Sequence, residues 1–228
     1  MDAPLKLVVF DVDGTLVDSQ GLIVDVMGAA FEANGLAAPA RETVLPLVGL
    51  SLERIMRELA PDHPATVHYG LVTGYREAYG KRMTGNAAAA SAPLFPGTVE
   101  MLDRLSADPN VLLGIATGKS RRGLDSMLDG HGLRQRFVTI QVADDHPSKP
   151  NPSMLFAALA ETGCDAQNTV MVGDTLFDME MAGNAGVAAV GVSWGYQEAA
   201  LLEPRARRVI DRWDGLDDAL DTIWKANA

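Results

Sequence analysis

The sequence predicts an α/β fold: a mostly parallel sheet covered by helices, with an all-helical insert near its beginning. Residues 5–10 form an almost uninterrupted apolar run, which is typical of a strand buried on both faces of a sheet. Residues 17–92 show only helical patterns, whereas the rest of the chain alternates short apolar runs with helical patterns. Such alternation indicates parallel βαβ units, because the crossover between parallel strands is usually a helix.

Three helical patterns define the insert. Apolar residues recur at intervals of three and four over 22–31, and Asn34-Gly35 supplies a C-terminal stop. The same periodicity runs over 52–59, and a weaker pattern extends over 67–83. The stretch 85–96 consists of small residues and then prolines, which is typical of a linker that closes the insert.

The elements after the linker belong to the sheet and its covering helices. We expect helices at 98–105, 120–128, 152–162 and 178–185, and strands at 111–116, 137–142, 169–172 and 187–192. The tail adds a short helix after 198, a strand-like run at 208–210 and a last helix at 216–224. We therefore divide the chain into a core domain, 1–16 and 93–228, and a helical cap domain, 17–92, which we expect to lie as a lid over Asp11.

Composition excludes several classes of partner. The 228 residues are 47% hydrophobic and carry a formal net charge of −11, so we expect no nucleic-acid partner and no anionic-membrane surface, which need clustered Lys and Arg. Cys164 is the only cysteine, the N-terminus resembles no signal sequence, and no apolar run approaches the ~20 residues of a membrane span. We expect a cytoplasmic protein.

Two carboxylates follow the first predicted strand. Asp11 and Asp13 lie two residues apart on an extended chain and so point the same general way, and Gly14 allows the backbone to turn. Ligands bind at the carboxyl ends of strands in open α/β sheets. An EF-hand calcium loop is excluded, because it needs glycine and glutamate where Leu16 and Leu22 stand. On this stretch alone, acids that cap the next helix remain an alternative.

The second and third polar clusters point to an anion. Thr117 and Gly118 follow the strand at 111–116 and offer a hydroxyl and backbone N–H groups at a helix N-terminus. A nucleotide P-loop would need glycine at Leu113 and is excluded. Lys149 precedes a helix that prolines open. A lysine is more often a solvated charge, but beside carboxylates and a phosphate its ammonium would offset their repulsion.

The fourth cluster points to a metal. Asp174 ends the strand at 169–172, and Asp178 stands in the first turn of the next helix. Helix capping explains one acid more easily than two. Oxygen ligands from Asp11, Asp174 and nearby groups describe a magnesium site rather than a zinc site.

These clusters together carry a resemblance. Residues 11–15, Thr117, Lys149 and residues 173–178, in this order and each after a predicted strand, resemble the four motifs of the haloacid dehalogenase superfamily. With its helical insert between the first and second motifs, the chain resembles the members with a helical cap of the C1 type, close to phosphoglycolate phosphatases. The resemblance implies a Rossmann-like, three-layer core.

The resemblance also implies a mechanism and its residues. Asp11 would attack phosphorus and form an aspartyl phosphate, and Asp13 would protonate the leaving alcohol and then accept a proton from water. We expect neighbouring carboxylates to favour the protonated form of Asp13. Thr117, the amide of Gly118 and Lys149 would hold the phosphoryl group.

Magnesium is the implied cofactor. It would be bound by the Asp11 carboxylate, the Asp13 backbone carbonyl and Asp174, with Asp178 as a ligand through water or as support behind the ligands. The substrate would be a small organic phosphate monoester, phosphoglycolate-like or a sugar phosphate, and the protein a monomer or homodimer. Residues 49–52, Arg54 and Arg57 could reach a leaving group, but an arginine on a helix is more often solvated, and we assign them no role.

Alternatives remain open at this point. A phosphoryl-transfer isomerase of the β-phosphoglucomutase type would use the same core motifs. A phosphonatase would need a Schiff-base lysine in the cap, where Lys81 is the one lysine, and a dehalogenase lacks the acid that stands here as Asp13. A non-catalytic binding protein is less favoured because every motif is present.

Overall fold

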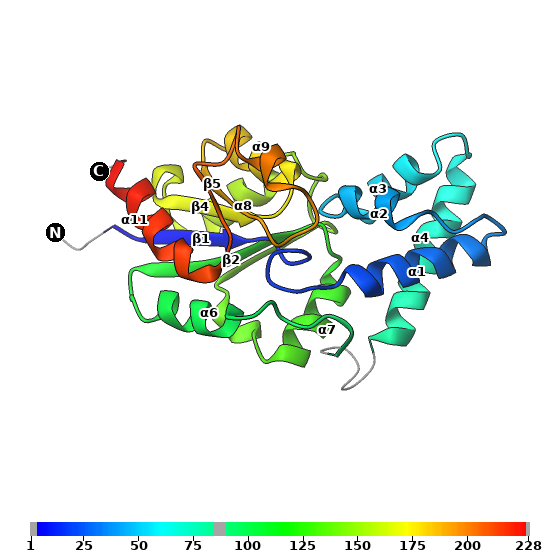
Figure 1. Ribbon diagram of the computed structural model, residues 1–228, viewed down its shortest axis with the longest axis horizontal. Helices are drawn as coiled ribbons and strands as arrows, with labels where there is room; N and C mark the ends of the chain where they lie inside the picture. Colours follow the sequence, from blue (N-terminus) through cyan, green and yellow to red (C-terminus); the bar gives the residue numbers. More distant parts are fainter. Residues whose placement is uncertain (1–3, 84–89, 227–228) are drawn as a thin grey trace.

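The computed structural model describes residues 4–83 and 90–226 and confirms the predicted parallel sheet (Figure 1). The strands are β1 (Lys6–Phe10), β2 (Val111–Thr117), β3 (Thr139–Val142), β4 (Thr169–Gly173), β5 (Ala188–Val192) and β6 (Arg208–Ile210). They form one sheet in the order β3-β2-β1-β4-β5-β6, and each neighbouring pair is parallel. The order places β1, with its acidic carboxyl end, in the middle of the sheet.

Helices cover both faces of the sheet and complete three layers. One layer contains α6 (Thr98–Ser106), α7 (Arg121–His131) and α11 (Leu216–Ala226), and the other contains α8 (Ser153–Thr162), α9 (Leu176–Asn184) and the short α10 (Ala199–Leu202). Along β1, Val8 and Phe10 pack into the first core, whereas Leu7 and Val9 pack into the second. Successive side chains of a strand face opposite sides, so a strand between two helical layers must be apolar throughout.

Within the described residues 17–83, the insert after β1 is made of helices that lie beside the carboxyl ends of the strands (Figure 1). They are α1 (Gln20–Ala33), α2 (Arg41–Val44), α3 (Leu52–Leu59) and α4 (Ala65–Arg82), with a 3-10 turn at Leu45–Leu47. Met27, Met56 and Leu71 are fully buried in an apolar cluster of their own. The sequence predicted α1, α3 and α4 but not α2, because four residues are too few to show a period.

The two connections between insert and sheet run side by side. Val17 bridges to Leu94, and the N–H of Asp18 donates to the carbonyl of Pro93 at 2.8 Å. These contacts lie close to the expected domain boundaries, and the domain division itself stays a prediction. Residues 85–89 of the predicted linker lie outside the described residues. Within 4–83 and 90–226, none of the helices combines the length and apolar composition that crossing a bilayer requires.

Two neighbouring residues of α8 offer a test of this layering. Leu155 is fully buried against the sheet, whereas Phe156, the next residue, is 51% exposed. We expect Leu155→Ala to lower the free energy of unfolding by about 2–5 kcal/mol, because it leaves a cavity in the core. Phe156→Ala should change it by no more than about 0.5 kcal/mol. Urea unfolding measures both, and equal losses would contradict the assignment of the buried face.

Candidate active site

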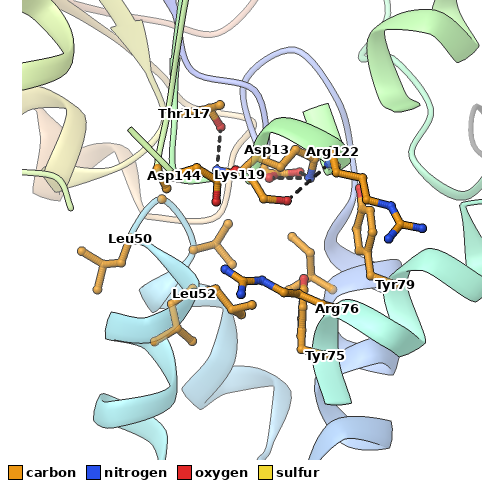
Figure 2. A pocket seen from close by; sticks show the side chains of 18 of the residues that line it. Asp13, Leu50, Leu52, Tyr75, Arg76, Tyr79, Thr117, Lys119, Arg122 and Asp144 are labelled. Carbon is orange, nitrogen blue, oxygen red and sulfur yellow. Dashed lines mark hydrogen bonds and ion pairs between the residues drawn. The ribbon is translucent and has the colours of Figure 1, made fainter. Parts of the chain in front are cut away.

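A cavity of about 370 Å³ lies between the carboxyl ends of the strands and the inserted helices. Asp11 and Asp13 line it from the loop after β1, and Thr117 and Gly118 line it from the end of β2. The insert contributes the opposite wall, including Leu50 and Tyr75 (Figure 2). The structure therefore brings the first two predicted motifs to one cavity and places the insert over them.

The loop after β1 depends on a glycine. Gly14 has φ +83°, and a Cβ at this position would lie 2.2 Å from Oδ2 of Asp174, so no other residue fits without moving that carboxylate. The hydroxyl of Thr15 donates to Oδ1 of Asp174 at 3.0 Å, and Nε1 of Trp194 donates to the carbonyl of Thr15 at 3.1 Å. These contacts hold the first motif against the last one.

Three buried carboxylates gather beneath the cavity. Asp11, Asp174 and Asp178 each offer an oxygen, and these oxygens lie within 4.8 Å of one another. Burial raises the pKa of Asp11 from 3.8 to about 7, against the lowering effect of Lys149. Burial and then the nearby Asp11 raise the pKa of Asp174 well above its ordinary value. Like charges this close need a positive partner.

The open coordination of Asp11 fits a divalent cation. Both oxygens are buried; among the described residues the Lys149 ammonium lies 2.9 Å from Oδ1, and Oδ2 accepts no hydrogen bond. Oδ2 of Asp174 accepts from the N–H of Tyr196 at 2.8 Å, which leaves further lone pairs on this carboxylate. Buried carboxylate oxygens that lack donors are the hard ligands that Mg²⁺, Ca²⁺ and Mn²⁺ prefer.

Lys149 is the one fully buried cation among these acids in the part of the chain that the structure describes. Its ammonium lies 2.9 Å from Oδ1 of Asp11 and 2.6 Å from Oδ1 of Asp178, and its side chain is 0% exposed. Burial alone would lower the pKa of Lys149, but the two facing carboxylates outweigh it and raise the pKa above the usual range. Lys149 is therefore held as a cation that links Asp11 to Asp178 in the first turn of α9.

Asp178 already accepts from three protein donors. One of its oxygens accepts from Lys149, and Oδ2 accepts from the N–H and the hydroxyl of Thr175 at 3.1 and 2.7 Å. Thr175 and Asp178 form a capping box that starts α9. The capping role weighed from the sequence thus applies to Asp178, in addition to its contact with Lys149.

Asp13 accepts hydrogen bonds from two neighbouring side chains. The ammonium of Lys119 donates to both of its oxygens at 2.7 and 2.8 Å, and the hydroxyl of Ser19 also donates to it. Burial lowers the pKa of Lys119, but Asp13 together with the nearby Tyr79 and Tyr75 outweighs it and raises the pKa above the usual range. Sequence reasoning passed over Lys119, although it stands two residues after Thr117 and so on the same side of an extended chain.

The turn after β2 touches the insert. The hydroxyl oxygen of Thr117 accepts from the N–H of Lys119 at 3.2 Å. A Cβ on Gly118 would lie 2.5 Å from the carbonyl oxygens of Gly49 and Leu50, so the insert rests directly on this glycine. The N–H of Ser51 then donates to Ser148 Oγ at 2.8 Å. Gly118 therefore allows close approach of the insert as well as offering an amide.

The arginines considered in the insert do not reach the cavity. Arg54 pairs with Glu58 on the surface of α3, and neither Arg54 nor Arg57 is among the described residues that line the cavity. Arg76 of α4, which sequence reasoning missed, does line it and pairs with Glu53 at 2.8 Å. Residues 49, 50 and 52 of the loop considered from the sequence also line the cavity.

Known proteins resemble this chain over most of its length. A family model described as haloacid dehalogenase-like hydrolase matches residues 8–192. A probable phosphatase IndB from Dickeya dadantii is 33% identical over 210 residues, which cover 90% of this chain and 88% of that protein. A phosphoglycolate phosphatase from Agrobacterium fabrum is 30% identical, with 94% and 91% covered. The crystal structure of a hydrolase from Pseudomonas syringae superposes with a TM-score of 0.83 at 25% identity, covering 96% and 99%.

Removing the buried ammonium tests the electrostatic balance of the site. Lys149→Met leaves Asp11 and Asp178 buried without their cation, so we expect the free energy of unfolding at pH 8 to fall by about 3–5 kcal/mol. The control is Lys225→Met, which removes a 77%-exposed ammonium from α11 and should leave the free energy of unfolding nearly unchanged. Denaturant unfolding at pH 8 gives both values. A Lys149→Met protein as stable as the wild type would refute this role.

Proposed function

This chain belongs to the haloacid dehalogenase-like hydrolase family, and on that basis we propose that it is a Mg²⁺-dependent phosphatase of small organic phosphate monoesters. The observation that carries the proposal is the position of the Asp11 carboxylate and the contacts that it makes. Its carboxylate stands at the carboxyl end of the central strand and lines the cavity, with the Lys149 ammonium on Oδ1 and no hydrogen-bond donor from the described residues on Oδ2. The names of the relatives from Dickeya and Agrobacterium, a phosphatase and a phosphoglycolate phosphatase, support the same reaction class.

Asp11 is proposed as the nucleophile. One carboxylate oxygen attacks phosphorus, the bond from phosphorus to the leaving oxygen breaks, and the phosphoryl group stays on Asp11 until water displaces it. Two easier steps replace one very slow hydrolysis. Lys149 lies on the same carboxylate at 2.9 Å and keeps negative charge from accumulating as the anionic ester approaches.

Asp13 is proposed as the proton carrier. It gives a proton to the leaving alcohol in the first step and accepts one from the attacking water in the second. Its side chain is held by the hydroxyl of Ser19 and the ammonium of Lys119. We therefore assign Lys119 a positioning role: it orients Asp13 toward the cavity.

The remaining core residues bind the phosphoryl group and the cation. The hydroxyl of Thr117 and the amide of Gly118 face the cavity and supply donors to the phosphoryl oxygens. Asp11, Asp174 and the backbone carbonyl of Asp13 would hold Mg²⁺, with Asp178 as support because its oxygens already accept from Lys149 and Thr175. When bound, the ion supplies positive charge that neutralises the phosphoryl oxygens during transfer. We retain the division into core, 1–16 and 93–228, and cap, 17–92, as part of this proposal.

The nucleophile assignment is tested by Asp11→Asn. An amide of similar size removes the nucleophile, so turnover of p-nitrophenyl phosphate with Mg²⁺ present should fall by about 10⁴-fold or more. Asp11→Asn should keep the wild-type melting temperature or exceed it, because it replaces a carboxylate whose pKa burial has raised. Asp62→Asn, an exposed loop carboxylate, is the control for the change in net charge. Turnover by Asp11→Asn near the wild-type rate would overturn the mechanism, and absence of wild-type turnover would overturn the function.

The cation site predicts a pH-dependent effect of Mg²⁺ on stability. Without a cation, the pKa of Asp11 is about 7 in the folded protein and 3.8 as a reference, so its stabilising proton is present at low pH and is lost as pH rises through about 7. Mg²⁺ binds the ionised cluster and offsets this loss. MgCl₂ should therefore raise the melting temperature clearly at pH 8 and little at pH 5.

Two controls accompany the Mg²⁺ measurement. Asp174→Asn should lose the increase in melting temperature at pH 8, whereas Asp62→Asn should keep it. Sodium chloride at equal ionic strength corrects for screening. Equal increases at both pH values, or an unchanged increase in Asp174→Asn, would contradict a cation site at this cluster.

A further inference from the structure

The cavity is larger than a phosphoryl group and a two-carbon leaving group require. Its volume of about 370 Å³ falls within the ~300–1,000 Å³ of pockets that enclose drug-sized ligands. Asp11, Asp13, Thr117 and Gly118 occupy one end, where the phosphoryl group would bind. The rest of the space lies against the inserted helices and is available to the leaving group.

The wall of this remaining space is mainly apolar. It is formed by side chains from α1, from the loop before α3, from α3 itself and from α4, namely Ile23, Met27, Leu50, Leu52, Ile55 and Tyr75. Tyr75 stacks on Tyr79, with ring centroids 6.1 Å apart and planes inclined by 19°. Figure 2 shows Leu50 and Leu52 on one side of the space and the two tyrosines on the other. Two apolar sides facing each other suit a flat or ring-shaped group between them.

The cations on the wall are already neutralised or turned away. Arg76 pairs with Glu53, and Lys119 pairs with Asp13. Arg122 also lines the cavity and is exposed, and in Figure 2 its guanidinium points away from Leu50 and Leu52. Asp144 adds negative charge to the lining. Among the described lining residues, a carboxylate held between the Leu50–Leu52 loop and Tyr75 would therefore meet only cations that are already paired, with Arg122 directed away from it.

We propose that the substrate is a phosphate monoester whose leaving alcohol carries an uncharged, ring-sized apolar group, held between the Leu50–Leu52 loop and Tyr75. This inference rests on the proposed phosphatase function and deepens it by naming the substrate class. It separates this chain from a phosphatase for a small anionic ester such as 2-phosphoglycolate, whose carboxylate the wall does not accommodate.

Three esters that all release primary alcohols test the proposal: benzyl phosphate, ethyl phosphate and 2-phosphoglycolate. With the wild-type enzyme and Mg²⁺, kcat/KM for benzyl phosphate should exceed the other two values by about tenfold or more, since each apolar group that fits a pocket adds discrimination. Phosphate release measures all three. A value for 2-phosphoglycolate equal to or above that for benzyl phosphate would overturn the proposal.

Variants of α4 locate the preference. Tyr75→Ala should lower kcat/KM for benzyl phosphate by about 3- to 10-fold while leaving ethyl phosphate nearly unchanged, because only the ring contacts this side chain. Tyr75→Phe keeps the ring and should retain the benzyl preference. Tyr69→Ala is the matched control, since Tyr69 lies on the same helix and is 75% exposed. An equal loss on both esters in Tyr75→Ala would indicate a merely structural role and would count against the proposal.

The results for these esters test the substrate class and the phosphatase function separately. Suppose that the wild type hydrolyses ethyl phosphate or 2-phosphoglycolate, that Asp11→Asn abolishes this turnover, and that benzyl phosphate is not preferred. This result would support the phosphatase function and refute the substrate class. Failure of the wild type to hydrolyse any of the three esters, or p-nitrophenyl phosphate, would refute the phosphatase function and the substrate class together.

Discussion

The molecule depends on keeping several carboxylates together at the end of one buried strand. Isolated charges at such a place would each lose most of their hydration, and burial duly raises the pKa of Asp11 and of Asp174. Lys149 offsets part of this by contacting Asp11 and Asp178 at once. The loops are built around that arrangement: Gly14 leaves room for Asp174, and Thr175 binds Asp178 at the start of α9. The loops after three strands thus hold one cluster of buried carboxylates and its lysine in place.

The parts of the fold that repeat a local pattern could be predicted from the sequence. The strands and the longer helices were found because burial on two faces leaves a continuous apolar run, and burial on one face leaves a period of three to four. The short helix at Arg41–Val44 is below the length at which a period can be seen. The acids after β1 and β4 were found for a related reason: a carboxylate directly after a buried strand is conspicuous, and parallel strands end at the same edge.

The unpredicted part of the site consists of pairings between distant segments. Lys119 lies on Asp13, 106 residues earlier in the chain, and Arg76 lies on Glu53 from a different helix. Nothing local distinguishes these side chains from solvated charges. Arg54 is the opposite case, a charge that was considered for the site but does not reach it. Ile55 and Met56 form the buried face of α3, so Arg54 lies on the surface, where it pairs with Glu58. Tertiary packing decides which face of a helix points toward the cavity. The sequence of that helix indicates this face only through the positions of its apolar residues.

The paired connections at Val17 and Leu94 have a consequence for the architecture as a whole. Because the chain leaves the sheet and returns to it at neighbouring points, the intervening helices form a module whose two ends meet at a single hinge-like junction. Such a module can be lengthened, shortened or exchanged for another without changing the register of any strand. The residues at the strand ends and the shape of the chamber above them can therefore change independently of one another.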